Sequence, residues 1–375
     1  MKNTKRNFLL TLAGLIFILI LGLIASNAFD EPLRPEVTAI LEERAPVSEN
    51  GAKAFYFLLG LDAGAKDPEA QGKELWERDF AQGLLKPWSI PSPPPEASLK
   101  SNTGLPTNLD AETLEALKQA RPYLDQYLRL LQFGELSNLP SPNPFGPAQS
   151  RASLLLTAHR WLSLHLQTLA AEGKWSEAEK LVRLENAFQS GFFSHTPVLQ
   201  LMISHLILRE NAQFLESELK AHPTWKLSPT TLATFKRPPP QDWIAQGLDQ
   251  ELRIFAKVSE RFASGFPVAL NAEEGPLFAL QKVPYYFVFK TKQTVNRYYD
   301  FITELKQNPT QTAEVAAAWT QPAWPWQWLL NPFGRNLMRL FTVNITHRYE
   351  TLLRFESELK ERLSRLESRV AVKKP

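Results

Sequence analysis

Residues 151–193 read RASLLLTAHRWLSLHLQTLAAEGKWSEAEKLVRLENAFQSGFF, and this stretch decides the predicted fold. Apolar side chains recur every three or four residues on both sides of EGKW, which is the spacing of amphipathic helices. The glycine within EGKW favours a turn between the two segments. Ser176, with Glu179 three residues later, has the pattern of a capping box and predicts the start of the second helix. The stretch therefore predicts a helical hairpin over residues 151–193.

The text around the turn, AAEGKWSEAEKL at residues 170–181, resembles the turn of a tetratricopeptide-like hairpin. In that family a glycine and an aromatic residue close two antiparallel helices. The repeat period of the family does not recur along this chain, whereas a solenoid needs at least about three repeats. The resemblance therefore implies one helical hairpin and not a repeat protein.

Helical spacing continues on both sides of the hairpin, interrupted by proline-rich joints, without sustained alternation of the strand type. Only YYFVF, at residues 285–289, lets a short strand compete with a helix. We therefore predict a mostly α protein, in which one N-terminal transmembrane helix precedes an exported all-helical domain of antiparallel helices.

The joints suggest a linear division of the chain. A cytoplasmic tip and anchor occupies residues 1–28, an N-terminal helical segment residues 29–85, and a proline-rich connector residues 86–109. The helical domain over residues 110–375 contains the hairpin 151–193, a tryptophan-rich loop at 319–332 and a long C-terminal helix at 333–370. Pro122 is expected to kink or divide a helix within residues 110–133.

The predicted final helix carries one apolar stripe at spacings of three and four residues, formed by Leu352, Phe355, Leu359, Leu363, Leu366 and Val370. Such a stripe must dock on another surface. Residues 335–374 also hold ten basic and five acidic side chains. A solvated face beside a core stripe is the favoured interpretation, and a helix that approaches anionic lipid or an acidic partner is the alternative.

The N-terminus predicts the membrane anchor. Lys2, Lys5 and Arg6 precede an uncharged run over residues 8–25, whose helix would be about 27 Å long, close to the hydrocarbon thickness of a bilayer. The preceding positive charges predict that the anchor crosses the bacterial inner membrane with the N-terminus in the cytoplasm. The rest of the chain would then lie in the periplasm. A signal peptide cleaved after Ala28 is the alternative. The lipid-contacting anchor residues are Phe8, Leu12, Leu15, Phe17, Leu19, Leu21 and Leu23.

Composition narrows the class further. The 375 residues are 44% hydrophobic, which is ample for a core, and the formal net charge of +3 gives no reason to expect a nucleic-acid partner. The chain has no cysteine, so disulfides, thiolate nucleophiles and cysteine-based zinc sites are excluded. A bacterial envelope or a reducing compartment suits this composition.

A search for catalytic motifs predicts no catalytic residue, metal site or cofactor. The pentapeptide ESELK occurs at residues 216–220 and 356–360 and contains Ser-x-x-Lys, but the companion motifs of serine acyl enzymes are missing. The glutamates of FESEL, at residues 355–359, are expected to be solvated, which suits them poorly as general acids. None of the six histidines has a partner at metal-binding helical spacing, so each is expected to be structural: His159, His165, His195, His205, His222 and His347.

Four of the ten tryptophans cluster around Pro322 and Pro325: Trp319, Trp324, Trp326 and Trp328. They are the candidate binding residues, and three interpretations remain open. The rings fill gaps between helices, or they lie at the membrane–water interface, or they form a stacking platform for glycan or for an extended proline-rich partner.

The motifs NPFGRN (residues 331–336) and NGAKAFYFLLGLDA (residues 50–63) are similar to motifs of an uncharacterised group of proteobacterial single-pass envelope proteins. That resemblance implies topology and an all-helical exported domain, and it assigns no activity. We therefore expect a membrane-anchored periplasmic scaffold or accessory protein of an envelope process that binds a protein partner. The alternative is a protein that binds cell-wall glycan, or an enzyme acting on wall glycan or peptide, through the tryptophan-rich loop.

Overall fold

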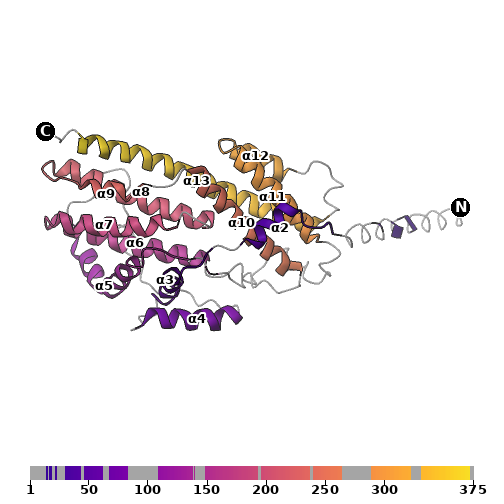
Figure 1. The fold of residues 1–375 in the computed structure, drawn as a ribbon, viewed down its shortest axis with the longest axis horizontal. Coiled ribbons are helices and arrows are strands. Elements are labelled where there is room, and N and C mark those ends of the chain that lie inside the picture. Colours follow the sequence, from indigo (N-terminus) through magenta and orange to yellow (C-terminus); the bar gives the residue numbers. More distant parts are fainter. Residues whose placement is uncertain are drawn as a thin grey trace, which may run out of the picture. The chain divides into compact units, whose positions relative to one another are not determined.

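The computed structural model describes residues 30–43, 46–61, 67–82, 109–137, 148–192, 196–236, 240–263, 289–321 and 331–371, with six isolated positions elsewhere. Every regular element in these ranges is a helix and none is a strand, which confirms the mostly α class (Figure 1). The helices are α2 (Pro35–Glu42), α3 (Glu49–Gly60), α4 (Pro68–Gln82), α5 (Ala111–Leu131), α6 (Ala148–Ala171), α7 (Trp175–Ser190), α8 (Val198–Ala221), α9 (Pro229–Ala233), α10 (Pro240–Ala263), α11 (Thr291–Gln307), α12 (Thr312–Thr320) and α13 (Pro332–Ala371).

The chain forms two compact units that are not contiguous in sequence. Unit 1 contains residues 1–44 and 251–347, and unit 2 contains residues 45–250 and 348–375. Helices α10 and α13 therefore contribute residues to both units. The linear division proposed from the sequence stays a prediction about domains.

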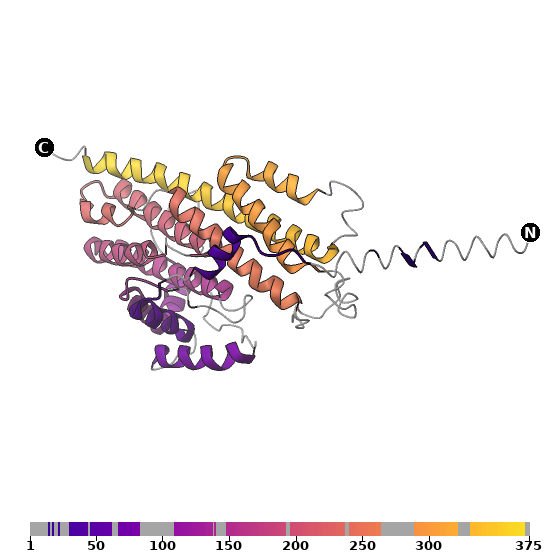
Figure 2. The ribbon, with the colours of Figure 1, turned by 45° about the vertical axis from the view of Figure 1, so that its right-hand side comes forward.

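The predicted hairpin is the centre of unit 2. Helices α6 and α7 are joined by a tight turn at Gly173, whose φ of 73° lies in the left-handed region that glycine adopts without strain. Helix α8 completes the layer, and the three helices lie side by side in both views (Figures 1 and 2). Helix α5 contacts α6 and α7. The core of unit 2 lies among these four helices.

The predicted capping box at the start of α7 is wrong. The helix begins one residue earlier, at Trp175, and its N-cap Lys174 makes no capping bond with its side chain. Glu179 lies on the buried face of the helix instead. Its carboxylate accepts hydrogen bonds from the backbone N–H of Ser228 at 2.9 Å and from the Thr231 hydroxyl. A tertiary contact to α9 has replaced the local one.

Helix α5 runs through Pro122 without being divided. Pro122 has no N–H to donate, so one carbonyl of the preceding turn loses its helical partner. The residue lies on the exposed face of α5, where water can solvate that carbonyl. The buried face, with Leu117, Leu124 and Tyr127, keeps its helical packing.

Two glycines allow α3 and α4 to cross closely. A Cβ atom on Gly60 would collide with the carbonyl oxygen of Pro68, and one on Gly72 would collide with that of Tyr56.

The same two helices are capped at their N-termini by nearby side chains. The Ser48 hydroxyl accepts from the Gly51 N–H at 2.9 Å, and Asp67 accepts from the Ala70 N–H at 3.2 Å.

The stripe of the last helix is covered by unit 2. Leu352, Leu359 and Leu366 have no exposed surface. The basic residues beside them bind α8, because Glu216 accepts from Arg362 at 2.9 Å and from Arg365 at 2.7 Å. Most of the stripe is therefore part of the core of unit 2, whereas Leu363 and Val370 are half-buried.

In unit 1, residues 30–43, which follow the predicted span, are hydrogen-bonded to α10 and α11. The Asp30 carboxylate accepts from the backbone N–H groups of Lys292 at 2.6 Å and Gln293 at 3.0 Å. Asn296 donates to Glu31 at 2.8 Å and to the Pro32 carbonyl at 2.9 Å, and it accepts from the Arg34 N–H at 3.1 Å.

Helix α2 completes this attachment in unit 1. Arg34 forms a two-pronged ion pair with Asp300 at 2.5 and 3.0 Å. Arg253 of α10 donates to the carbonyl of Ile40 at 2.7 Å and to Glu43 at 2.6 Å. Residues 30–43 are therefore part of the fold of unit 1.

The predicted span at residues 8–25 lies almost wholly outside the described residues. Gly14, Leu15, Phe17, Ile18 and Gly22 are described, and they are helical. Within the described part of the chain, none of the helices combines the length and apolar character that crossing a bilayer requires. Residues 86–108 of the predicted connector and most of YYFVF also lie outside the described residues.

Candidate functional site

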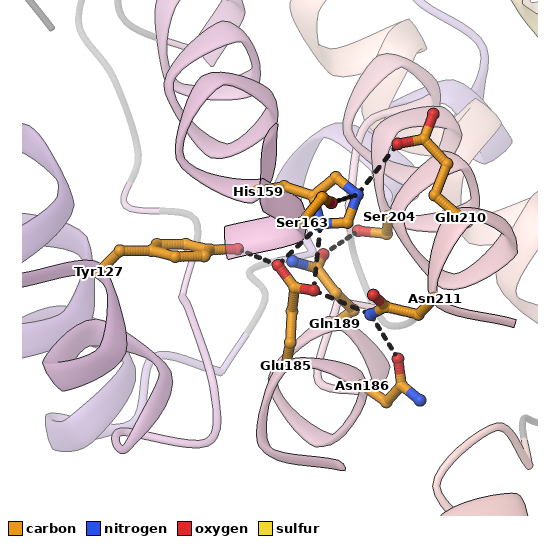
Figure 3. A network of polar contacts seen from close by, with 9 residues as sticks. All are labelled: Tyr127, His159, Ser163, Glu185, Asn186, Gln189, Ser204, Glu210 and Asn211. Carbon is orange, nitrogen blue, oxygen red and sulfur yellow. Dashed lines mark hydrogen bonds and ion pairs between the residues drawn. The ribbon is translucent and has the colours of Figure 1, made fainter. Parts of the chain in front are cut away.

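A buried network of polar side chains crosses the four helices α5 to α8 of unit 2 (Figure 3). Its members occupy core-facing positions at helical spacing, where apolar residues are usual. They come from every helix of the layer: Tyr127 of α5, His159 and Ser163 of α6, Glu185, Asn186 and Gln189 of α7, and Ser204, Glu210 and Asn211 of α8. This network is the candidate functional site.

Glu185 is the centre of the network and has no exposed surface. One oxygen of its carboxylate accepts from the Tyr127 hydroxyl at 2.7 Å, and the other accepts from the Asn211 amide at 2.8 Å. Both oxygens also lie 3.0 and 3.1 Å from Nδ1 of His159. A buried carboxylate is tolerated only with such partners, and here three helices supply them.

His159 lies between two carboxylates. Its Nδ1 faces Glu185, and its Nε2 lies 3.0 Å from Glu210. Both ring nitrogens therefore donate, which requires the imidazolium form. Burial by itself lowers the pKa of His159, but the charges of Glu185 and Glu210 and the hydrogen bonds to them outweigh it and raise the pKa from 6.5 to about 10.

The same contacts shift the pKa values of two neighbours. Burial, followed by the nearby charge of Glu185, raises the pKa of Tyr127 well above 10. Burial also acts to raise the pKa of Glu210, but the hydrogen bond and charge of His159 lower it on balance, helped by Arg209 and Arg160. At neutral pH the network therefore contains an imidazolium, two carboxylates and a neutral phenol.

Amide and hydroxyl groups extend the network. Asn211 donates to Asn186 at 2.9 Å, Asn186 donates to the Thr234 hydroxyl at 3.2 Å, and the Ser204 hydroxyl donates to Gln189 at 2.9 Å. Asn186, Gln189, Ser204 and Asn211 are at most 1% exposed. These bonds fix the relative positions of α7, α8 and the residues after α9.

The arrangement of Ser163, His159 and Glu185 has the order of a serine hydrolase triad, since the Ser163 hydroxyl lies 3.4 Å from Nε2 of His159. A general base must have an unprotonated nitrogen facing the hydroxyl. Here Nε2 donates to Glu210, and the raised pKa keeps the ring protonated. The three residues therefore cannot act as a triad in this arrangement, and the geometry supports a structural ion cluster.

A second buried pair joins α8 to α13. Nδ1 of His205 donates to the carbonyl of Leu201 at 2.8 Å, and its Nε2 lies 3.0 Å from Glu356. The ring packs at a tilt against Trp243 of α10, with centroids 4.7 Å apart. His159 and His205 are therefore paired structural histidines, as expected, whereas no sequence pattern indicated their partners. His195 lies outside the described residues.

The expectation that both FESEL glutamates are solvated is wrong for Glu356. This residue is 7% exposed, because it directly follows Phe355 and lies at the edge of the apolar stripe. Glu356 also pairs with Lys360 at 3.3 Å. In the other copy of ESELK, Glu216 binds Arg362 and Arg365. Both glutamates serve the docking of α13 on α8.

Of the four candidate binding tryptophans, only Trp319 is described. It lies in α12, which ends at Thr320, so Trp319 is helical and not in a loop as predicted. Its indole N–H donates to Glu304 at 2.6 Å, and its ring lies edge-on to Phe301 at 6.2 Å. Trp319 therefore fills a gap between α11 and α12. Trp324, Trp326 and Trp328 lie outside the described residues, so their roles stay predictions.

No protein-family model, curated protein sequence or solved structure matches this chain. Among the described residues, no group of three or more His, Asp or Glu side chains is arranged to hold a metal ion. The assignment of function therefore depends on the residues themselves.

Proposed function

We propose that the protein is a single-pass, membrane-anchored helical scaffold or accessory protein of a bacterial envelope process, and that it acts by binding a protein partner. The observation that carries this proposal is the polar network of unit 2. Its imidazolium lies between two carboxylates, and its hydrogen bonds join four helices. Such a network favours one rigid packing arrangement, which suits a surface that must keep its shape for a partner.

Two features support the membrane anchor. Leu15, Phe17 and Ile18 of the predicted span are helical and 60–67% exposed, as expected of side chains that contact lipid. The residues that follow the span are hydrogen-bonded to α11 from Asp30 onward. We propose that the N-terminus lies in the cytoplasm and that both units lie in the periplasm.

The glycan-acting alternative has no comparable support. The proposed substrate grip of this enzyme depends on Trp324, Trp326 and Trp328, which lie outside the described residues. Trp319 is engaged with Glu304 and Phe301, so it is not free to stack on a sugar. The scaffold proposal is therefore the one favoured by the described contacts.

A photo-crosslinking side chain at Leu114 would test the proposal in bacterial cells. Leu114 is 37% exposed on α5, the helix that supplies Tyr127 to the network. We expect a discrete adduct with a membrane-fraction protein, and loss of that adduct when His159→Gln loosens the network. The proposal fails if Leu114 and the 45%-exposed Val47 both give no adduct while the purified chain cleaves cell wall.

A further inference from the structure

The N-terminal half of α13 has an exposed apolar face. Leu340 is 61% exposed and Val343, one turn later, is 56% exposed. Outside the predicted span, they are the large apolar side chains exposed among the described residues of unit 1. Arg339, Asn344 and His347 are exposed beside them. Neighbouring apolar residues on one helix face mark a contact surface more strongly than scattered ones.

The opposite side of this helix is fixed in the core of unit 1. Phe333, Leu337, Met338 and Ile345 are 2–7% exposed. Phe341 lies edge-on to Phe255, with centroids 4.9 Å apart. The face with Leu340 and Val343 therefore points outward because the other side of α13 is packed.

The basic excess of α13 belongs to the same half of the helix. Its residues before Glu350 include Arg335, Arg339 and Arg348 and no acidic residue. The remaining residues balance, with five acids against five bases: Glu350, Glu356, Glu358, Glu361 and Glu367 against Arg354, Lys360, Arg362, Arg365 and Arg369. Exposed apolar residues flanked by cations are the pattern of a helix that lies at an anionic lipid surface.

The start of α13 is next to the place where the chain arrives from the predicted span. Asn331 accepts from the backbone N–H groups of Lys290 at 2.9 Å and Gly334 at 3.2 Å, which joins the first turns of α11 and α13. Asp30 binds the same first turn of α11. Asp30 lies five positions after Ala25, the end of the span, so the two are at most about 18 Å apart. Leu340 follows Pro332 by about 12 Å of helix.

We propose that the face formed by Arg339, Leu340, Val343 and His347 rests on the surface of the bilayer and contacts anionic lipid headgroups. This inference rests on the proposed membrane anchor, because the anchor brings that end of unit 1 within reach of the lipid. The contact would hold unit 1 against the membrane.

Because the chain has no cysteine, single labelling sites can be introduced without background. Val343→Cys and Ser357→Cys would each carry an environment-sensitive fluorophore in the full-length chain. Both positions are exposed on α13, so the second is a matched control. Each labelled chain would be reconstituted into phosphatidylcholine vesicles, with or without phosphatidylglycerol, that contain a lipid-attached quencher.

We expect quenching and a blue-shifted emission at position 343 that are at least twofold stronger than at position 357. We also expect the signal to weaken without phosphatidylglycerol and with Arg339→Glu. The proposal is overturned if the chain floats with vesicles while position 343 emits as in water. If position 343 shows the same blue shift with and without vesicles, another surface covers the face. That result would also overturn the proposal. A chain that does not float at all would overturn the anchor together with this contact.

Discussion

At the residue scale, His159 joins three helices of unit 2. A lone buried imidazole is a common core residue, but this one is bonded on both nitrogens by carboxylates from two other helices. The ion pairs do not by themselves indicate a net gain in stability, because burying charges is costly. Removal of one member is costly, however, because it leaves the opposite charges buried without a partner.

We therefore predict that His159→Gln destabilises the protein by about 3–5 kcal/mol, since Glu185 and Glu210 lose their shared cation. Urea unfolding of the full-length chain in detergent, followed by circular dichroism, measures this change. The same substitution at the exposed His347 is the control and should change stability by less than about 0.5 kcal/mol. Equal changes in the free energy of unfolding at the two positions would show that the network contributes no more to stability than an exposed side chain does.

The pH dependence of stability gives a second prediction. Because the pKa of His159 is raised from 6.5 to about 10 in the folded chain, its contribution is complete below pH 6.5 and is lost as the pH rises toward 10. Of the groups that face it, Tyr127 has its pKa raised well above 10 and Glu210 has its pKa lowered. Unfolding midpoints should therefore fall between about pH 7 and about pH 10, and His159→Gln should flatten that slope. A slope unchanged in the variant would contradict the assignment.

At the scale of elements, α13 is divided by its surroundings. Its second half is docked on α8 by the covered stripe, by the His205–Glu356 pair and by Arg209, which lies 4.4 Å above the ring of Phe355 and binds Glu358 at 2.8 Å. Its first half has one packed side and one exposed apolar side. The same helix therefore serves as a core element in one part and offers a surface in the other.

We predict that Glu216→Gln loosens the end of α13, because Arg362 and Arg365 lose their shared carboxylate. The free energy of local opening should fall by on the order of 1 kcal/mol at residues 352–371, so hydrogen exchange at their amides should become faster. Glu361→Gln is the matched control, since Glu361 also pairs with Arg365, but its side chain is 71% exposed. The docking role of Glu216 would be refuted by identical exchange in the two variants.

At the scale of the whole molecule, the sequence order and the compact units differ. Unit 1 is built from residues near the N-terminus and residues beyond 250, so the chain that leaves the predicted span folds directly onto α11. This attachment gives the proposed anchor a mechanical consequence, because residues 30–43 behave as part of unit 1 and not as a free tether.

We predict that Asn296→Ala releases this segment locally, since Asn296 bonds Glu31, Pro32 and the backbone of Arg34. Amides of residues 34–43 should exchange about tenfold faster, which corresponds to about 1.4 kcal/mol. Exchange over α5 of unit 2 should stay unchanged. Gln307→Ala, at the exposed end of α11, is the control. If residues 34–43 keep their protection in Asn296→Ala, the amide is not what holds them.

The sequence by itself determined the elements whose signals are local. Helical periodicity predicted the hairpin and the long last helix. Tertiary structure decided the candidate site, because the partners of Glu185 are 58 and 26 residues away on other helices, at Tyr127 and at His159 and Asn211. It also turned Glu179 from its predicted cap toward α9 and buried Glu356. Periodicity shows which face of a helix is buried, but only packing shows which charges meet there.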